Sequence, residues 1–148
     1  MIQRIQSIYL LSAIAFILIC FFTSLGQIND ATIGLYRLID GHGQTLDAPS
    51  YFVYIPLTLV LGLNTWALTS YKNRHRQMSI VRFTFILLAI VFSLSTLTII
   101  SAKGIIGSET FVPGMAFLSP FFAFVCNFLA LKAIRKDDDL VRSVNRVR

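Results

Sequence analysis

The run IQSIYLLSAIAFILICFFTSL, residues 5–25, contains no charged side chain. A helix needs roughly 20 largely apolar residues to cross about 30 Å of hydrocarbon, and this run reaches that length. Three further stretches reach it as well, at residues 51–71, 80–102 and 110–131, and Arg82 is the only charge within them. Four such runs in succession predict an all-α integral membrane protein in which residues 1–136 form a four-helix transmembrane bundle.

The composition of the whole chain supports this prediction. Its 148 residues are 55% hydrophobic and only 14% charged, and the mean hydropathy is +0.72. A soluble domain carries about 25% charged residues, so a soluble enzyme, a disordered chain or a disulfide scaffold does not fit this composition. The first run is longer than the core of a typical signal peptide, and no A-x-A-like site follows it. We therefore expect it to be retained as an anchor.

The basic residues lie mainly on one side of the predicted bundle. Eleven of the 13 Lys and Arg residues precede the first run, lie around the second connection or follow the fourth run, whereas Arg37 and Lys103 lie on the other side. Short loops enriched in Lys and Arg face the cytoplasm. The bias predicts a multi-pass protein with N- and C-termini in the cytoplasm. The net charge of +6 is then a consequence of topology, and nucleic acid is not a leading partner.

The first outer loop, residues 26–50, contains the turn signal Asp40-Gly41-His42-Gly43 between the short runs 32–39 and 44–46. This pattern predicts a small β-hairpin in the first periplasmic loop. The second outer loop, residues 103–109, is rich in glycine and is expected either to add a strand or to form only a turn. The Asp, Glu and His residues of these loops match no known metal-binding spacing, so no metal site is expected.

The tail, residues 137–148, is predicted to be a short cytoplasmic amphipathic helix that begins at the Asp triplet, because Asp is favoured at a helix start. Such a helix can dock on a partner or lie on anionic lipid, whereas a solvated basic tail is the alternative. The candidate docking residues form one apolar face, with three arginines largely off it: Leu140, Val141, Val144 and Val147, and Arg142, Arg146 and Arg148.

Small and polar residues recur at three-four spacing in each run and predict the packed face of each helix, because lipid gives helices no hydrophobic reason to associate. A stripe of phenylalanines, Phe117, Phe121, Phe124 and Phe128, is free to face lipid or fill a groove. The predicted packed faces are Gln6, Ala13, Cys20 and Ser24; Thr58, Gly62, Thr65 and Thr69; Ala89, Ser93 and Thr96; and Pro113, Ala116, Pro120, Ala123, Asn127 and Ala130.

Asn64 and Asn127 are the most polar residues deep within the runs. Polar groups at such depth are costly unless they are paired, so we expect them to hydrogen-bond each other or a headgroup. Pro120 removes a backbone hydrogen bond and predicts a kink.

The residues needed for several chemistries are missing from the four runs. No Asp, Glu or His lies within them, although proton-coupled transport uses such groups. His42 and His75 fall on opposite sides, so they cannot form a paired haem site, and Cys20 and Cys126 lie too far apart to bridge. We therefore expect no catalytic residues, no cofactor and no enzymatic activity.

The chain resembles a family known as domain of unknown function 4293, small four-span inner-membrane proteins of Gram-negative bacteria. The residues that carry the resemblance are MIQRIQSIYLL at 1–11, the basic connection Lys72-Asn73-Arg74, and the tail AIRKDDDLVRSVNRVR at 133–148. The family has no established activity, cofactor or catalytic residue. The resemblance therefore implies architecture and localisation in the bacterial inner membrane, and no chemistry.

Two functional hypotheses follow. The first is a non-catalytic accessory or scaffold subunit of a bacterial inner-membrane assembly, with membrane lipids and a larger protein complex as partners. The second is a small transporter or lipid-binding membrane protein acting as a homo-oligomer. In that case Asn64, Asn127, Thr65 and Ser93 would line a polar route, helped by the kink at Pro120.

Overall fold

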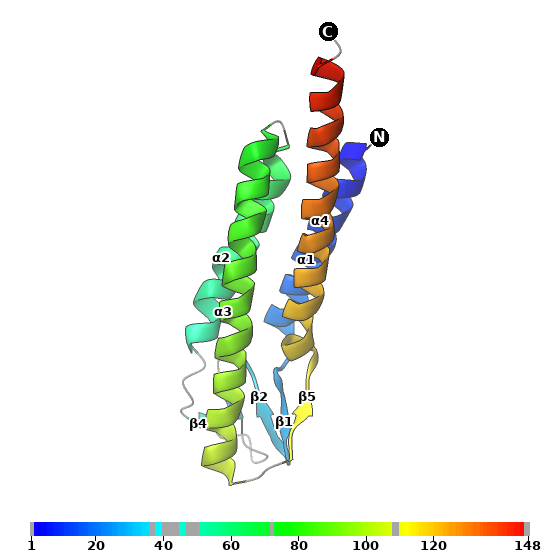
Figure 1. The fold of residues 1–148 in the computed structure, drawn as a ribbon. Coiled ribbons are helices and arrows are strands. Elements are labelled where there is room, and N and C mark those ends of the chain that lie inside the picture. Colours follow the sequence, from blue (N-terminus) through cyan, green and yellow to red (C-terminus); the bar gives the residue numbers. More distant parts are fainter. Residues whose placement is uncertain are drawn as a thin grey trace.

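The computed structural model describes residues 2–35, 38–39, 45–46, 51–71, 73–107 and 110–146. This part of the chain forms four helices that run along one long axis, with a small sheet at one end (Figure 1). Helix α1 begins and α4 ends at the opposite end. The helices are α1 (Ile2–Phe22), α2 (Tyr51–Thr69), α3 (Arg74–Ile106) and α4 (Met115–Arg146). The strands are β1 (Gly26–Ile28), β2 (Ala31–Ile33), β3 (Leu38–Ile39), β4 (Thr45–Leu46) and β5 (Val112–Pro113).

Three helices are long and apolar enough to cross a membrane: α1 over Ile5–Phe22, α3 over its whole length, and α4 over Met115–Val141. The apolar part of α2, Val53–Thr69, is shorter. Large apolar side chains cover the outside of the bundle, and Phe22 is 86% exposed. A soluble monomer rarely exposes so much continuous apolar surface, whereas a surface that faces lipid does.

The sheet is antiparallel and has the strand order β4-β3-β2-β1-β5. Strands β3 and β4 pair across the predicted turn, as the sequence pattern indicated, although residues 40–44 lie outside the described part. Strands β1 and β2 form a second hairpin, which the turn signal at residues 40–43 did not predict. Its two-residue turn begins at Asn29, whose φ of 53° is a left-handed conformation that Asn tolerates better than most residues.

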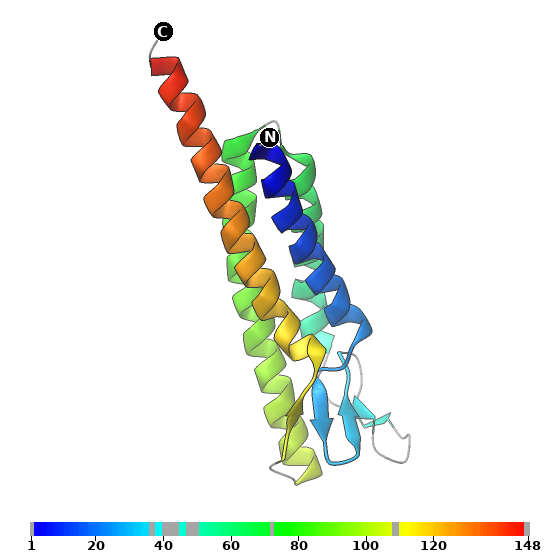
Figure 2. The ribbon, with the colours of Figure 1, turned by 90° about the vertical axis from the view of Figure 1, so that its right-hand side faces the viewer.

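The fourth helix begins at Met115, so the predicted start at residue 110 is wrong. Val112 and Pro113 instead form β5 and pair with β1. Gly114 donates its N–H to the carbonyl of Leu25 at 2.9 Å, and Ala116 donates to the carbonyl of Ser24 at 3.1 Å. A Cβ atom on Gly114 would collide with the carbonyl oxygen of Ser24. Glycine at this position therefore allows the sheet to join the end of α1 to the start of α4 (Figure 2).

The predicted small-residue faces of α1 and α4 are confirmed except at Ser24 and Pro113, which lie outside these helices and are not buried. Gln6, Ala13 and Cys20 of α1 are buried, and so are the α4 residues Ala116, Pro120, Ala123, Asn127 and Ala130. Two apolar clusters lie along the axis. The cluster nearer the sheet includes Ile17, Val60, Leu88 and Ala123, and the cluster nearer the opposite end includes Leu10, Ala67, Val81 and Ala130.

The predicted packed faces of α2 and α3 are wrong. Thr58, Gly62, Thr65 and Thr69 are exposed, and so are Ala89 and Ser93. Threonine needs no partner helix here, because the Thr65 hydroxyl donates to the carbonyl of Leu61 at 2.9 Å within its own helix. The buried faces are mainly aliphatic and comprise Val53, Leu57, Val60, Asn64 and Ala67 of α2, and Thr84, Leu88, Val91, Ser95, Thr98 and Ala102 of α3.

The tail does not start a new helix, which corrects the prediction for residues 137–148. Helix α4 continues without a break to Arg146 and extends beyond the ends of its neighbours (Figures 1 and 2). Asp137 lies inside this helix and is buried, so it is not a cap. Leu140 and Val141 are exposed. The structure describes only the backbone of three other predicted docking residues, which is helical: Arg142, Val144 and Arg146. Their side chains lie outside the described part, and so do Val147 and Arg148.

Candidate functional site

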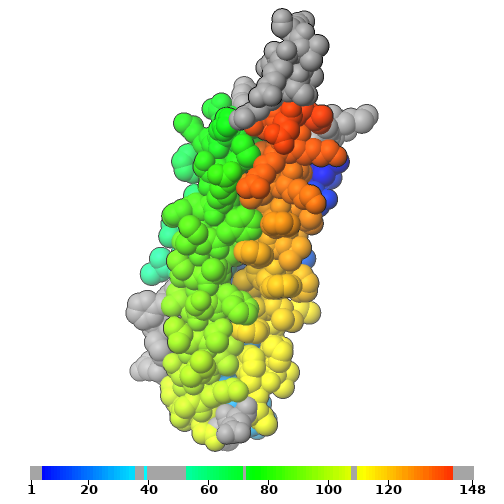
Figure 3. Space-filling model, in the orientation of Figure 1, coloured from blue at the N-terminus to red at the C-terminus, as the bar shows by residue number. Residues whose placement is uncertain are grey.

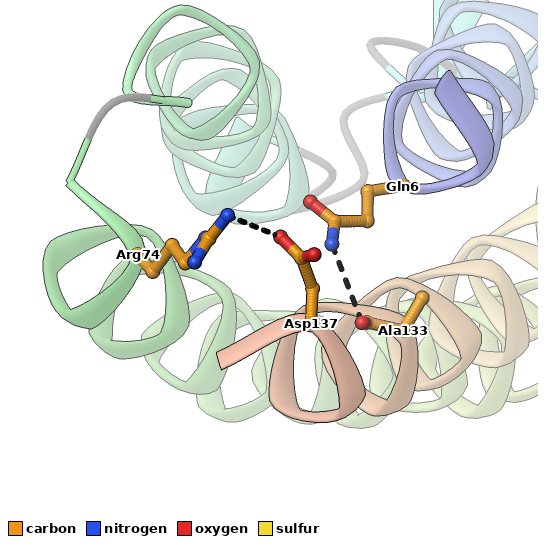
Figure 4. Close-up of polar contacts among 4 residues, drawn as sticks. All are labelled: Gln6, Arg74, Ala133 and Asp137. Atoms are coloured by element: carbon orange, nitrogen blue, oxygen red, sulfur yellow. Dashed lines mark hydrogen bonds and ion pairs between the residues drawn. The ribbon is translucent and has the colours of Figure 1, made fainter. Parts of the chain in front are cut away.

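Polar contacts join α1, α3 and α4 at the end opposite the sheet. Nη2 of Arg74 lies 2.8 Å from Oδ2 of Asp137. Nε2 of Gln6 donates to the carbonyl of Ala133 at 3.3 Å, one turn before Asp137 (Figure 4). The carboxylate of Asp137 points into the space between Arg74 and Gln6 (Figure 4). We call these four residues the polar junction, because they connect three helices that are remote in the sequence.

Local structure explains why Arg74 and Asp137 meet. Asp137 continues the buried stripe of α4 at three-four spacing after Ala130 and Ile134. Arg74 is the first residue of α3 and follows a tight connection in which the N–H of Asn73 bonds to the carbonyl of Ser70 at 3.1 Å. A carboxylate on the packed stripe needs a cation, and the first residue of α3 supplies it. The three-four spacing of Ala130, Ile134 and Asp137 was visible in the sequence. It was overlooked because the Asp triplet was interpreted as the start of a helix.

A second inter-helix bond supports the same end of the bundle. Nε2 of Gln77 donates to the carbonyl of Ala67 at 3.1 Å and thereby connects α3 to α2. Gln77 is only 3% exposed. Since a carbonyl in the last turn of a helix lacks an intrahelical partner, this bond satisfies a group that would otherwise be buried and unpaired. The connection between α2 and α3 is therefore held by side chains as well as by its backbone.

Asn64 and Asn127 are completely buried in the middle of the bundle. Asn64 lies between Val60 and Ala67, which belong to different apolar clusters, and Asn127 lies between Ala123 and Ala130 in the same way. Thr84, also buried, lies at the corresponding level of α3 and donates to the carbonyl of Val81 at 2.6 Å. These residues form an amide layer, which we define as Asn64, Thr84 and Asn127. It separates the two apolar clusters.

The hydrogen bonding of the amide layer is incomplete among the described residues. Nδ2 of Asn64 donates to the carbonyl of Val60 at 3.0 Å. Oδ1 of Asn64 and both amide atoms of Asn127 have no partner in that part of the chain. The expected hydrogen bond between the two asparagines is therefore not formed, and their complete burial excludes a headgroup contact. Unpaired amide atoms at this depth are costly.

The other three predicted site residues are placed apart from the amide layer. Thr65 lies on the exposed side of α2, and Ser93 lies on the exposed side of α3, where its hydroxyl donates to the carbonyl of Ala89 at 2.9 Å. Pro120 is buried in α4 and borders the same groove as Ser93. The structure therefore brings Ser93 and Pro120 together at one groove. Thr65 belongs neither to this groove nor to the amide layer.

A groove of about 330 Å³ runs between α3 and α4, which lie side by side on the face shown in Figure 3. We call it the α3/α4 groove. Ring pairs join the two helices nearby: Phe92 with Phe117 at 5.2 Å and Phe85 with Phe124 at 4.9 Å between centroids. The groove is lined by Leu88, Ala89, Phe92 and Ser93 of α3 and by Pro120, Phe121 and Phe124 of α4.

A second groove, of about 270 Å³, lies between α1 and α4 near the polar junction. Its lining combines apolar surface with two basic side chains, Lys132 and Lys136, both of which are exposed. We call it the α1/α4 groove. The remaining lining residues are Ile5, Tyr9, Leu129 and Ala133.

Within the described residues, no group of three or more His, Cys, Asp and Glu side chains is arranged to hold a metal ion. Cys20 and Cys126 are free thiols, and the Cys20 thiol donates to the carbonyl of Ala116 at 3.3 Å.

Comparison with known proteins agrees with the resemblance seen in the sequence. A search of curated proteins found no match. The family model described as Domain of unknown function (DUF4293) matches residues 2–147, which is nearly the whole chain. The chain therefore belongs to the DUF4293 family.

Proposed function

We propose that this protein is a non-catalytic accessory or scaffold subunit of a bacterial inner-membrane assembly, and that the α3/α4 groove receives a transmembrane helix of its partner. In this proposal α1, α2, α3 and α4 all cross the membrane, and both termini lie in the cytoplasm. The observation that carries it is that the small residues Ala89 and Ser93 of α3 are exposed and line this groove.

The proposed membrane position is supported by the charges of α3. Arg82 and Lys103 lie on this helix, and at 1.5 Å per residue about 31 Å of helix separates them. This length matches the roughly 30 Å of a hydrocarbon core. The exposed basic residues Arg76, Arg135 and Lys136 then lie on the same side as Arg82, which the positive-inside rule assigns to the cytoplasm. The sheet lies beside the last turns of α3, at the Lys103 end of the bundle (Figure 1).

The chemistry of the α3/α4 groove favours a helix as its occupant. Ala89 and Ser93 are four residues apart and exposed, a small-xxx-small spacing that allows two helix backbones to approach closely in lipid. Phe92 and Phe121 border this strip and offer a large contact area to a neighbour. Since helix association in lipid depends on close packing, a small strip between aromatic side chains is a suitable docking surface.

Filling the groove tests the proposal. Ser93→Trp blocks the small strip, and Thr65→Trp is the matched control, because Thr65 is likewise exposed and bonds only to its own helix. Both variants and the natural protein are extracted with native lipid and examined by mass spectrometry. We expect a stoichiometric partner with the natural protein and Thr65→Trp, and at least a tenfold loss with Ser93→Trp. Recovery of the natural protein only as a monomer would overturn the proposal.

The alternative is a small transporter or lipid-binding protein acting as a homo-oligomer. The polar route proposed for it has weak support, because its four residues do not line one path. Thr65 and Ser93 lie on the outside of different helices, whereas Asn64 and Asn127 are buried inside the bundle. Lipid binding has a specific observation in its favour, namely the basic residues of the α1/α4 groove. In the extraction experiment, a partner mass equal to that of this chain would identify the homo-oligomer.

A further inference from the structure

The α1/α4 groove is built from residues spaced one turn apart on two helices. Ile5 and Tyr9 form the α1 side. Leu129, Ala133 and Lys136 form most of the α4 side, and Ala133 provides a small residue between the larger ones. Residues four apart lie on one face of a helix, so each side of the groove presents a continuous strip along the bundle axis. The groove is therefore elongated in the direction in which an acyl chain lies.

The polar part of this groove is basic and available. Lys132 and Lys136 are exposed, one turn apart, and neither forms an ion pair with a described residue. The adjacent carboxylate, Asp137, is buried and bound to Arg74 at 2.8 Å, so it does not neutralise the lysines. Asp139 is exposed and lies three residues after Lys136, further from the apolar strip. The groove thus has two free ammonium groups at one end.

The depth of the lysines fits the boundary between hydrocarbon and headgroups. Lys132 is the first charged residue of α4, about 26 Å along the helix from Met115. Leu129 and Ile5, which are 37% and 48% exposed, provide the apolar surface beside it. Lysine extends its charge toward the headgroup layer from such a position, and tyrosine is enriched at the same level.

We propose that the α1/α4 groove binds one anionic phospholipid. Its phosphate lies between the ammonium groups of Lys132 and Lys136, and an acyl chain follows Ile5, Tyr9 and Leu129. Ala133 gives the chain room beside α4. The zwitterionic lipids of the same leaflet lack the net negative charge that the two lysines complement. This site does not depend on the proposed partner, because the α3/α4 groove is formed by different residues.

The proposal is tested by lipid binding to the purified full chain in a neutral detergent. Phosphatidylglycerol and phosphatidylcholine are added at equal concentrations, and bound lipid is counted by native mass spectrometry. We expect one molecule of phosphatidylglycerol to bind and phosphatidylcholine to bind at least tenfold more weakly. At about 1 kcal/mol per basic residue near an anionic surface, the double variant Lys132→Gln and Lys136→Gln should weaken phosphatidylglycerol binding about 30-fold.

Three comparisons distinguish a built site from general charge attraction. Arg76→Gln with Arg135→Gln removes the same charge from exposed residues of the same end that do not line the groove, and this control should bind phosphatidylglycerol within threefold of the natural protein. Lys132→Arg with Lys136→Arg should retain binding. Ala133→Phe, which keeps both lysines but fills the groove, should weaken it at least tenfold while thermal unfolding stays within a few degrees.

Several results would overturn this proposal. Equal binding of the two lipids, or equal weakening by the control pair and the lysine pair, would show that no specific site exists. Displacement of phosphatidylglycerol by an equal concentration of inorganic phosphate would show that the lysines bind a free anion. Loss of binding with Lys132→Arg and Lys136→Arg in a folded protein would contradict a role based on charge.

Discussion

The guanidinium of Arg74 lies 2.8 Å from the carboxylate of Asp137, and this ion pair fixes the first turn of α3 against α4. The two side chains are 22% and 11% exposed. Asp137 is the first of three consecutive aspartates, a sequence that resembles a helix start but lies deep within α4. The ion pair explains how the helix can continue, because the carboxylate is held by another helix and does not compete for the backbone N–H groups that a cap would bind.

Removal of one partner of this pair should lower the stability of the bundle. Deleting one member of a fully buried pair costs about 3–5 kcal/mol, and partial exposure reduces the expectation for Asp137→Ala to about 2 kcal/mol. Asp139→Ala, an exposed member of the same triplet, should change stability by less than about 0.5 kcal/mol. Unfolding by denaturant in detergent measures both. Equal effects of the two variants would show that the ion pair contributes no more than the surface charge.

Removal of the Asn127 amide, in contrast to removal of Asp137, should not lower the stability of the bundle. Both of its amide atoms are completely buried without a partner among the described residues. Replacing such a group with an apolar side chain of similar size is neutral or stabilising, so Asn127→Leu should raise or preserve thermal stability. Asn64→Leu should gain less, because it also removes the bond to the carbonyl of Val60. A loss of more than about 2 kcal/mol with Asn127→Leu would show that this amide is satisfied in the membrane.

The variant Asn127→Leu also separates the functional hypotheses. In the accessory-subunit proposal, a well-folded Asn127→Leu protein should recover its partner in native lipid as well as the natural protein does. In the transporter alternative, this folded variant should lose flux of a small polar solute across vesicles. Flux in the natural protein that disappears in a stable Asn127→Leu variant would therefore favour the alternative over the scaffold.

The contact between Gly114 and Ser24 predicts a strong dependence on glycine. A Cβ at position 114 would collide with the backbone carbonyl of Ser24, which cannot move without disturbing the sheet. Gly114→Ala should therefore destabilise the protein by about 2 kcal/mol or more. Gly104→Ala is the matched control, because this glycine lies within α3 and its Cβ would meet no atom within 4 Å. The control should stabilise the protein by about 0.5–1 kcal/mol. Denaturant unfolding of the pair provides the measurement.

The proposed topology is tested with reporter fusions. A reporter enzyme that works only in the periplasm should be active when it is fused after Ser50. One that works only in the cytoplasm should be active when it is fused after Arg148, because eleven of the 13 basic residues lie toward the proposed cytoplasmic side. A periplasmic signal from the fusion after Arg148 would contradict a bundle of four spans. It would then favour three spans, with the shorter α2 lying outside the membrane.

The sequence predicted the helices well because long apolar runs have few alternatives. It could not decide which face of α2 or α3 is buried, because lipid and protein interior are both apolar and no polar face marks the outside. Ala89 and Ser93 illustrate this ambiguity, since a small strip can pack within the chain or against a neighbour. Val112 and Pro113 were assigned to the membrane because they belong to a long run without charge, although the Pro113-Gly114 pair was itself a break signal. Asp137 was missed because the triplet was interpreted alone, without the stripe that leads to it.

Two truncations separate the structural and docking roles of the tail. Deletion after Lys136 removes Asp137 and should destabilise the bundle as Asp137→Ala does. Deletion after Asp139 keeps the ion pair with Arg74, so stability should stay within about 0.5 kcal/mol of the natural protein. Leu140 and Val141, which are 45% and 41% exposed on the extension of α4, are lost in both. We expect the longer variant to fold normally and to bind its partner or anionic vesicles more weakly.

Salt distinguishes the two ways in which this extension can bind. Attraction of Arg142 and Arg146 to anionic lipid weakens as added salt shortens the Debye length from about 10 Å at 0.1 M to about 3 Å at 1 M. Docking through an apolar face that includes Leu140 and Val141 should persist in 1 M salt and fail with Val141→Asp. Arg142→Gln is the control that removes charge and keeps this face. If the chain truncated after Asp139 retains both its vesicle binding and its partner at low salt, residues 140–148 have no docking role.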